Sequence, residues 1–337
     1  MMNKKVFIIA ELSANHNHSF DLALETIKAM ADSGADAVKI QTYTPDSMVM
    51  DVDNEYFGAI PDGPWKGIKR YDLYKQGMMP YEWQPKLKAY AESLGMVFFS
   101  TPFDIDGVDF LEKMNVPIYK VASFEINDIP LIKKIAQQHK PVIMSTGVAG
   151  LDDIDLAINT CRKEGVFDIT LLKCTSEYPA PYDHVNLMTI PDMKQRFGVK
   201  VGLSDHTMGS DVAIAAVALG ATVIEKHFII DRSIGGPDSA FSMEPSEFKQ
   251  MVNSIRIVEQ TLGIATYELS ERNKKRRRAL YATKDIAEGE LFTKDNIRSF
   301  RPSEGLSPKY YYDLIGKPSK RIIKRGDPLL ECDLWAL

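Results

Sequence analysis

Two histidines in this sequence have a type and spacing suited to metal chemistry. His206 and His227 each end a short apolar segment, and they stand 21 positions apart. Two imidazoles on neighbouring strand ends could hold a divalent cation and leave coordination positions for water and a substrate. The alternative is a pair of structural or acid–base histidines. Because imidazole accepts several transition ions, the pair does not identify the metal.

Lysines and hydroxyl groups at other segment ends favour an anionic ligand. The cations are Lys39, Lys120 and Lys173, and the hydroxyl groups are those of Thr101, Ser123, Ser145 and Ser204. Cations beside O–H donors suit a phosphate or a carboxylate. A buried lysine needs an anion, and Glu11, Glu125 and Glu225 could be structural partners instead. A Schiff base on Lys120 or Lys173, as in aldolases, also stays open.

Two loops near these residues carry further candidates. Residues 235–238, Gly-Gly-Pro-Asp, are either a tight turn or a loop whose Asp238 accepts hydrogen bonds from substrate hydroxyls. The segment 43–79 is long for a connection in a compact domain and holds Trp65, Tyr71 and Tyr74. Long loops in compact domains are functional or disordered, and these aromatic residues favour an ordered lid or wall for a ligand.

Eight short apolar segments must position these side chains. They cover residues 6–12, 37–42, 97–101, 118–123, 142–146, 169–174, 201–204 and 223–228. Helical patterns lie between or after them at residues 22–33, 82–93, 108–114, 131–138, 154–163, 187–196, 212–219 and 247–262. Apolar strands alternating with helices predict a parallel sheet covered on both faces.

Eight such units predict an α/β fold of the (β/α)8 TIM-barrel type. An open doubly wound sheet is the alternative, but no G-x-G-x-x-G follows the first strand to support it. In a barrel the carboxyl ends of all strands meet at one mouth, where active sites are built. We therefore expect the histidines, lysines and hydroxyl groups to converge there.

The pattern changes near residue 270. A basic run at residues 272–278 precedes about 60 residues of short strands and turns. We predict a barrel domain over residues 1–265, a basic linker over 266–278 and a small domain over 279–337. Ile286 and Gly289 recur at an offset of 37 as Ile323 and Gly326, a faint internal repeat.

Composition limits the class of protein. The 337 residues are 45% hydrophobic and 26% charged, as in ordinary globular proteins. A net charge of −5 argues against nucleic acid as the main partner. The apolar run that ends at Glu11 is too short for a signal peptide, and no stretch approaches the ~18 residues of a membrane span. Three cysteines without paired spacing are expected as reduced thiols in a cytoplasmic protein with no membrane partner.

Short motifs occur in order along nearly the whole chain. They are Glu11 with Asn15-His16, Val38-Lys39-Ile40-Gln41-Thr42, Ser100-Thr101-Pro102-Phe103, Lys120-Val121-Ala122-Ser123, Ser145-Thr146-Gly147, Cys174-Thr175-Ser176-Glu177-Tyr178-Pro179, Gly202-Leu203-Ser204-Asp205-His206-Thr207, Glu225-Lys226-His227-Phe228, Gly236-Pro237-Asp238 and Phe300-Arg301-Pro302. The ordered set resembles the sialic acid synthase family, whose members condense phosphoenolpyruvate with an acylamino sugar. The resemblance implies a TIM barrel followed by a small C-terminal antifreeze-like (SAF, β-clip) domain.

The resemblance also implies roles for individual residues. His206 and His227 would bind a divalent metal, usually Mn²⁺, with Mg²⁺ or Co²⁺ possible. The phosphoenolpyruvate site would comprise Lys39, Thr101, Lys120, Ser123, Ser145, Ser204 and Arg301. The sugar site would comprise Gln41, Ser176, Tyr178, Asp238, Phe241 and Arg301. Catalysis would fall to Lys39 and Lys120 with a carboxylate, Glu11 or Glu125, acting on water.

Family members form domain-swapped homodimers, so Arg301 would come from the antifreeze-like domain of a partner subunit. Within the family, Ser13-Ala14, His18 and Ser239 depart from the pattern of neuraminate synthases. Together with Phe241 they favour the pseudaminate-forming branch, whose sugar carries a methyl group at C6. Neuraminate or legionaminate formation by the same chemistry is the alternative. A Schiff-base aldolase and a non-catalytic sugar-binding protein are more distant ones.

Overall fold

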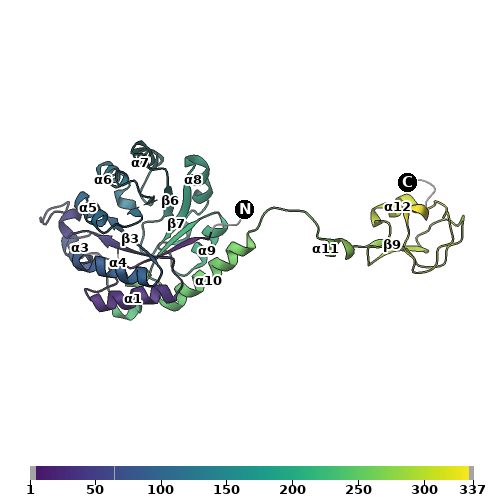
Figure 1. The fold of residues 1–337 in the computed structure, drawn as a ribbon, viewed down its shortest axis with the longest axis horizontal. Helices are drawn as coiled ribbons and strands as arrows, with labels where there is room; N and C mark the ends of the chain where they lie inside the picture. The colour runs from purple at the N-terminus through teal and green to yellow at the C-terminus, as the bar shows by residue number, and fades with distance from the viewer. Residues whose placement is uncertain (1–4, 64, 334–337) are drawn as a thin grey trace. The chain divides into compact units, whose positions relative to one another are not determined.

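Eight parallel strands close into a barrel surrounded by helices (Figure 1). The strands are β1 (Phe7–Glu11), β2 (Ala37–Thr42), β3 (Val97–Pro102), β4 (Tyr119–Val121), β5 (Val142–Ser145), β6 (Ile169–Cys174), β7 (Lys200–Asp205) and β8 (Val223–His227). β8 pairs with β1 from Phe7↔Val223 to Glu11↔His227, which closes the sheet. The predicted TIM barrel is confirmed, and the open doubly wound alternative is wrong. The computed structural model describes residues 5–63 and 65–333.

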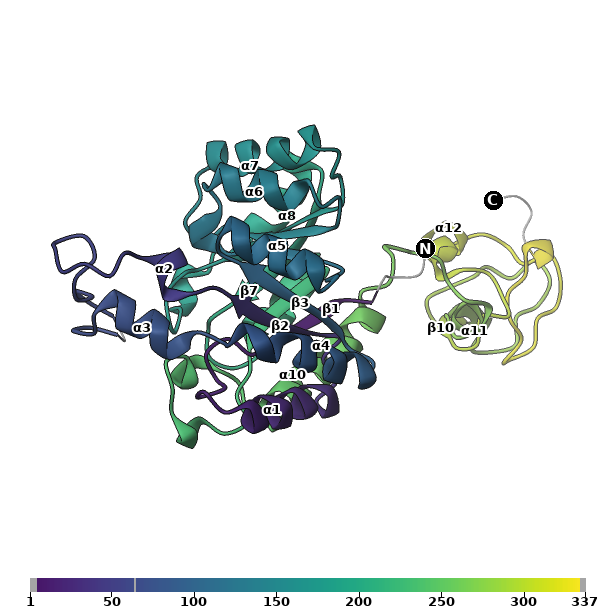
Figure 2. The ribbon, with the colours of Figure 1, turned by 60° about the vertical axis from the view of Figure 1, so that its left-hand side comes forward.

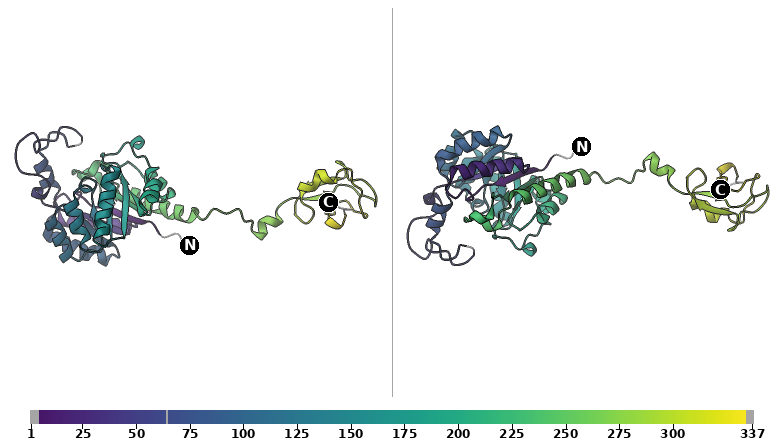
Figure 3. Two further views of the ribbon diagram at one scale, coloured as in Figure 1. Left: turned by 90° about the horizontal axis from the view of Figure 1, so that it is seen from above. Right: turned by 90° about the horizontal axis from the view of Figure 1, so that it is seen from below.

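Helices follow the strands as the sequence predicts. They are α1 (Phe20–Asp32), α2 (Pro45–Met48), α3 (Arg70–Gly77), α4 (Gln84–Ser93), α5 (Ile105–Lys113), α6 (Ile129–Ala136), α7 (Leu151–Lys163), α8 (Thr189–Phe197), α9 (Asp211–Ala218) and α10 (Pro245–Thr261). Short 3₁₀ turns occur at η1 (Tyr81–Trp83), η2 (Ser123–Glu125), η3 (Tyr182–His184), η4 (Arg232–Ile234) and η5 (Ser239–Phe241). Several helices start at side-chain caps, such as Ser19, whose Oγ accepts a hydrogen bond from Leu22 N at 3.2 Å. In Figure 3 the last barrel helix, α10, lies beside α1, the first.

The strands bury apolar side chains on both faces. One cluster contains strand residues alone and fills the barrel interior: Ile9, Ala37, Phe99, Ile143, Leu172 and Val223. The alternating residues of the same strands join a larger cluster together with helix residues, and this cluster forms the layer between barrel and helices. Because both faces are covered, the strands read as continuous apolar runs.

The long connection between β2 and β3 contains two short helices that the sequence pattern did not reveal, α2 and α3. Figure 2 shows this connection extending from the barrel near β2. Trp65 ties it back, because the indole Nε1 donates a hydrogen bond to Pro237 O at 3.1 Å. The segment is therefore ordered and lies against the loop that follows β8.

The chain divides into two units, Met1–Gly263 and Ile264–Leu337. The second unit pairs β9 (Ala279–Ala282) with β10 (Ile297–Phe300) and contains α11 (Glu271–Lys275), α12 (Tyr311–Leu314), η6 (Pro308–Tyr310) and η7 (Glu331–Asp333). Its own core consists of Leu280, Ala282, Ile286, Phe292, Ile297, Leu306, Leu314, Ile323 and Leu329. Ile286 and Ile323, the two positions of the repeat, pair as an antiparallel bridge. A single turn of helix, α11, lies within the segment predicted as a linker.

Within the described residues, none of the helices combines the length and the apolar character that crossing a bilayer requires.

Candidate active site at the barrel mouth

A ring of polar side chains points into the barrel between the apolar interior and the carboxyl ends of the strands. Each strand contributes one member, two residues after its apolar inward residue, since side chains alternate between faces. The polar ring consists of Glu11, Lys39, Thr101, Lys120, Ser145, Cys174, Ser204 and Glu225. All eight side chains are buried. Eight buried polar groups at the inward strand ends favour a site for a charged ligand over solvated strand ends.

Lys39 occupies the acidic side of this ring. Its Nζ lies 2.7 Å from Glu11 Oε2 and 3.7 Å from Glu225 Oε1, and it donates a hydrogen bond to Thr101 Oγ1 at 3.4 Å. Burial lowers the pKa of Lys39, but the two carboxylates outweigh it and leave the pKa raised, so the ammonium stays charged. Burial raises the pKa of Glu11 to about 7 although Lys39 opposes this.

Lys120 lies on β4, two strands along from Lys39, and contacts a hydroxyl group. Its Nζ donates hydrogen bonds to Ser145 Oγ at 2.7 Å and to Val121 O at 2.9 Å. Burial lowers the pKa of Lys120, and the charge of Lys39 adds to this, although Glu225 opposes it. A buried ammonium held by neutral groups is suited to an anion arriving from solution.

Ser123 and Ser176 converge on Gly147 beside Lys120. Gly147 N donates a hydrogen bond to Ser123 Oγ at 3.1 Å. A Cβ at position 147 would lie 2.2 Å from Ser176 Oγ and 2.9 Å from Ser123 Oγ, so only glycine fits there. The predicted hydroxyl groups and Lys120 therefore come from neighbouring strand ends and form one cradle.

The two predicted metal ligands lie side by side at the mouth, with ring centroids 5.3 Å apart. His206 Nδ1 contacts Thr175 O at 3.0 Å, and because a carbonyl only accepts, Nδ1 carries the proton and leaves Nε2 free. His227 Nδ1 is buried without a hydrogen-bond partner among the described residues, and Asp238 Oδ2 lies 3.7 Å away. Burial, with His206 next to it, keeps the pKa of His227 well below its usual value.

Two adjacent imidazoles with free nitrogens fit a divalent cation. The described residues contain no cluster of three or more His, Cys, Asp or Glu side chains that could hold one. The fit therefore rests on the two imidazoles alone.

A second pair of charges holds the histidine-bearing strand ends together from the outer face. Asp205 and Lys226 directly precede the two histidines and pair across β7 and β8. Lys226 Nζ lies 2.7 Å from Asp205 Oδ2 and donates to Thr207 O at 2.7 Å, while Asp205 Oδ1 accepts from Thr207 N at 2.9 Å. We call Asp205, Thr207 and Lys226 the β7–β8 clamp. It fixes the backbone on which both imidazoles are mounted.

Aromatic side chains form the other wall of the mouth. Tyr178 lies 4.4 Å from the His206 ring and 5.1 Å from Phe241, centroid to centroid, and Phe241 lies 5.0 Å from His227. Asp238 is buried beside them, and its Oδ2 accepts a hydrogen bond from Ala14 N at 3.3 Å. Gln41 follows Lys39 on the same face of β2, one step nearer the opening.

Glu125 follows β4 in η2 with one carboxylate oxygen, Oε2, buried and without a hydrogen-bond partner among the described residues. Burial raises the pKa of Glu125 to about 7, against the opposing charge of Lys120. A carboxyl group that titrates near neutral pH can give or take a proton at little cost.

One predicted cation, Lys173, does not point into the mouth. Leu172 and Cys174 point inward, so Lys173 points outward, and its Nζ donates to Cys174 O at 2.7 Å and to Thr175 Oγ1 at 3.3 Å. The expectation that Lys173 adds a cation to the mouth is wrong, and Lys173 is excluded as a Schiff-base lysine there. Arg301 is exposed in the second unit, directly after β10.

Cys174 belongs to the ring but was not singled out from the sequence, whereas Glu225 was expected only as a structural partner of the lysines and Trp65 only as part of a lid or wall. Cys174 Sγ lies 3.8 Å from His206 Nδ1, and its thiol was expected only to be reduced; all three cysteines are indeed unpaired. Burial opposes ionisation of this thiol, but His206 lowers the pKa of Cys174 to about 7. The two-residue alternation from Leu172 was the signal that could have placed it inside.

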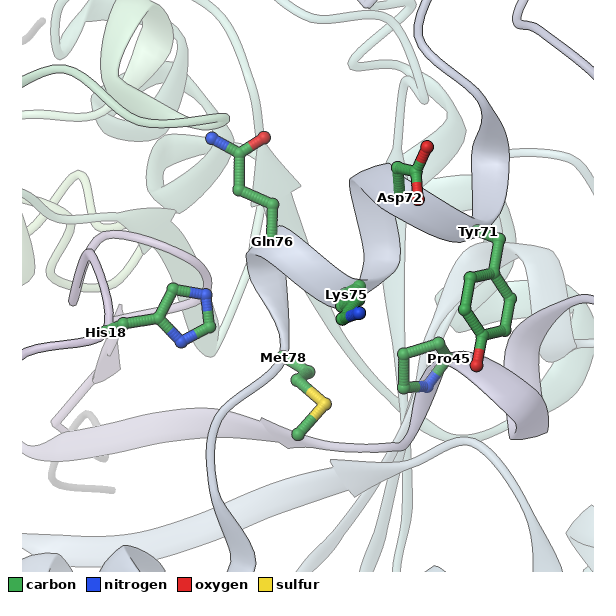
Figure 4. A pocket seen from close by; sticks show the side chains of 7 residues that line it. All are labelled: His18, Pro45, Tyr71, Asp72, Lys75, Gln76 and Met78. Atoms are coloured by element: carbon green, nitrogen blue, oxygen red, sulfur yellow. The ribbon is translucent and has the colours of Figure 1, made fainter. Parts of the chain in front are cut away.

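A cavity of about 630 Å³ lies outside the ring, between the loop before α1 and the helices α2 and α3 (Figure 4). It is lined by His18, Pro45, Tyr71, Asp72, Lys75, Gln76 and Met78. It contains none of the predicted site residues.

Comparisons with known proteins agree with this geometry. The family model described as NeuB family matches residues 26–267, and the SAF domain matches residues 277–334. Pseudaminic acid synthase of Campylobacter jejuni subsp. jejuni is 46% identical over 334 residues, covering 98% of this chain and 97% of that protein. Pseudaminic acid synthase of Helicobacter pylori is 43% identical over 331 residues, covering 97% of each chain.

A solved structure extends the similarity to the fold. It is the N-acetylneuraminic acid synthetase of Leptospira borgpetersenii serovar Hardjo-bovis in complex with citrate. The two chains share 31% identity with a TM-score of 0.72, over 80% of this chain and 89% of that one.

Proposed function

The chain belongs to the NeuB family, and from that premise we propose that it condenses phosphoenolpyruvate with 2,4-diacetamido-2,4,6-trideoxy-L-altrose and water, giving pseudaminic acid and phosphate. The resemblance seen in the ordered motifs is confirmed, and the chain is a sugar-acid synthase, an enzyme of the transferase type. Two relatives, at 46% and 43% identity, are pseudaminic acid synthases, and the alignments cover 97% of their lengths. This similarity supports the choice of sugar.

The observation that carries this proposal is the composition of the buried polar ring. Lys39 on β2 and Lys120 on β4, 4% and 1% exposed, contact the hydroxyl groups of Thr101 and Ser145, respectively. Phosphoenolpyruvate carries a phosphate and a carboxylate, and each ammonium neutralises one of these anions. Ser123 and Ser145 orient the phosphate beside Lys120.

Bond formation joins C3 of phosphoenolpyruvate to the aldehyde carbon of the open-chain sugar. The electron pair comes from the C2–C3 double bond, the C=O π pair of the aldehyde moves to its oxygen, which takes up a proton, and positive charge develops at C2 beside the carboxylate held by the ring. Water adds to C2 and loses a proton, and the C2–O bond to phosphate then breaks, with loss of the remaining hydroxyl proton to leave the keto acid. Asp238, Gln41 and Tyr178 hold the sugar hydroxyl groups.

Glu125 is the base for the water. Its Oε2 is buried without a partner among the described residues, whereas Glu11 is already ion-paired to Lys39 at 2.7 Å. A base must be free to accept a proton, so Glu11 instead holds Lys39 in place.

His206 and His227 would hold a divalent cation, Mn²⁺ by family expectation, with Mg²⁺ or Co²⁺ as alternatives. When bound there, it would supply Lewis-acid polarisation of the sugar aldehyde. His206 is kept in the required tautomer by Thr175 O, and the β7–β8 clamp keeps the two rings facing one another.

The assembly belongs to the same proposal. The enzyme works as a domain-swapped homodimer in the cytoplasm, and the partner subunit's Arg301 adds a cation to the site. This arrangement would give a role to the exposed Arg301, which directly follows β10 in the small second unit.

Phosphate release tests the proposal directly. Purified protein is given phosphoenolpyruvate and Mn²⁺ with either the 6-deoxy diacetamido altrose or N-acetylmannosamine. We expect turnover with the altrose alone. Turnover with N-acetylmannosamine instead would keep the chemistry and overturn the substrate. If neither sugar reacts, the legionaminate precursor is tested next, and borohydride trapping of Lys120 then tests the aldolase.

A further inference from the structure

Trp65 lies at the sugar side of the mouth, in the middle of the long β2–β3 connection and far in sequence from any strand end. It is half-buried, and its ring lies 5.6 Å from that of Tyr178, centroid to centroid. Tyr178 in turn contacts Phe241 at 5.1 Å. We call Trp65, Tyr178 and Phe241 the aromatic wall. Three elements supply it: the β2–β3 connection, the segment after β6, and η5.

The indole presents only its apolar surface to a ligand. Its single N–H donates to Pro237 O at 3.1 Å, and tryptophan has no other polar atom. Ser239, in the same turn, is also occupied, because its Oγ donates to Gly236 O at 3.0 Å. This part of the site therefore offers carbon to a substrate and no free hydroxyl group from Ser239.

The wall lies at the right distance for the far end of a six-carbon sugar. From His206 to Tyr178 is 4.4 Å and from Tyr178 to Trp65 is 5.6 Å, so the indole lies at most 10.0 Å from the imidazole. Five C–C bonds of about 1.5 Å in an extended chain span roughly 6 Å. With the aldehyde carbon next to His206 and His227, a sugar chain that extends along the wall can place C6 between Tyr178 and Trp65.

We propose that Trp65, with Tyr178 and Phe241, is the specificity determinant that selects a methyl group over a hydroxyl group at C6 of the sugar. A methyl group is transferred from water to an apolar surface with a gain in free energy. A hydroxyl group at the same place loses hydrogen bonds to water that the indole surface cannot replace. The inference rests on the proposed function, since it names the feature of that sugar which the site reads.

The test compares two sugars that differ only at C6. Wild type, Trp65→Ala, Trp65→Phe and the control Ser239→Ala are assayed with the 6-deoxy diacetamido altrose and with its 6-hydroxy counterpart. Trp65→Ala is expected to lower kcat/KM for the 6-deoxy sugar by about 10–100-fold and to reduce the preference for it, with the KM for phosphoenolpyruvate unchanged. Trp65→Phe and Ser239→Ala keep the preference.

Fluorescence gives a readout that does not depend on turnover. The chain has three tryptophans, so Trp65→Phe removes only the one at the wall. Titration with the 6-deoxy sugar is expected to change the emission of wild type but not of Trp65→Phe. An equal loss of kcat/KM for both sugars, or identical emission changes in the two proteins, would overturn the role of Trp65. A wild-type protein that binds the sugar through Trp65 without turning it over would instead overturn the proposed function.

Discussion

Glu125 ties the chemistry of the site to pH. Burial raises the pKa of this carboxyl group from 4.5 to about 7, so it is a carboxylate only above that value. A base must be unprotonated, and kcat is therefore expected to fall tenfold per pH unit below about pH 7. Glu125→Gln should lose about 10²–10³ in kcat and lose this dependence on pH as well. The measurement is kcat of wild type and Glu125→Gln from pH 5 to 9. If kcat of Glu125→Gln still falls below pH 7 as in wild type, another residue is the base.

The buried carboxylate of Glu125 is also expected to lower the stability of the folded protein near neutral pH. Since the folded protein binds this proton more tightly than the unfolded chain, the free energy of unfolding falls as the pH rises from about 4.5 to about 7. Glu125→Gln removes the buried charge and is expected to raise Tm by a few degrees at pH 8, with little change at pH 4.5. Thermal melts at both pH values measure the difference. A lower Tm at pH 8 would show that the carboxylate is stabilised by contacts other than those described.

His206 can be tested without relying on turnover alone. His206→Ala leaves His227 as the single imidazole at the mouth, so affinity for Mn²⁺ should fall at least 100-fold and phosphate release should be lost. Electron paramagnetic resonance titration of free Mn²⁺ measures binding, and circular dichroism verifies that the barrel is intact. Full activity in metal-stripped wild type would contradict a role for a cation.

At the scale of elements, β7 takes part in two ion pairs of similar length and opposite burial, one with β8 and one with the residue before β6. Lys226–Asp205 spans 2.7 Å with both side chains 1% exposed, and Lys200–Asp168 spans 2.6 Å with side chains 55% and 51% exposed. Asp205→Asn leaves a buried ammonium unpaired, and we expect it to cost about 3–5 kcal/mol of unfolding free energy. Asp168→Asn, the matched control, should cost less than about 1 kcal/mol. Urea denaturation of both variants decides; equal losses would mean that burial does not set the strength of the clamp.

The elements also show how far the sequence could predict this site. Strands, their order and their polar ends follow from apolar runs and helical spacing, so the barrel and the meeting of His206, Lys39 and Lys120 were predictable. Which lysine turns inward depends on the phase of each strand, and a shift of one residue reverses it, which is why Lys173 was misplaced. The sequence placed Trp65 in a lid or wall but not its contacts, because the path of a long connection is set by tertiary contacts such as its hydrogen bond to Pro237.

At the scale of the whole molecule, the proposed dimer makes a prediction about mixing. If each site takes its arginine from the other chain, His206→Ala and Arg301→Ala are both inactive alone, but a mixed dimer contains one complete site. Refolding the two variants together at equal amounts should restore about one quarter of wild-type activity, because half of the dimers are mixed. Phosphate release before and after mixing measures it.

Two outcomes would contradict this arrangement. No recovery after verified subunit exchange would place Arg301 in its own chain's site or outside both. Full activity of a protein truncated after Gly263, where the barrel unit ends, would remove Arg301 from the site altogether.

The alternation of β7 and β8 has a consequence for insertions and deletions. Ser204 and His206 face the mouth while Asp205 between them faces the helices, and Glu225, Lys226 and His227 repeat this pattern. A single codon gained or lost within either strand would turn the clamp charge into the mouth and an imidazole into the apolar layer. Point substitutions at inward positions leave the outer layer untouched. The substrate specificity of the barrel can therefore change through amino-acid substitutions at inward positions, but insertions and deletions must stay in the loops.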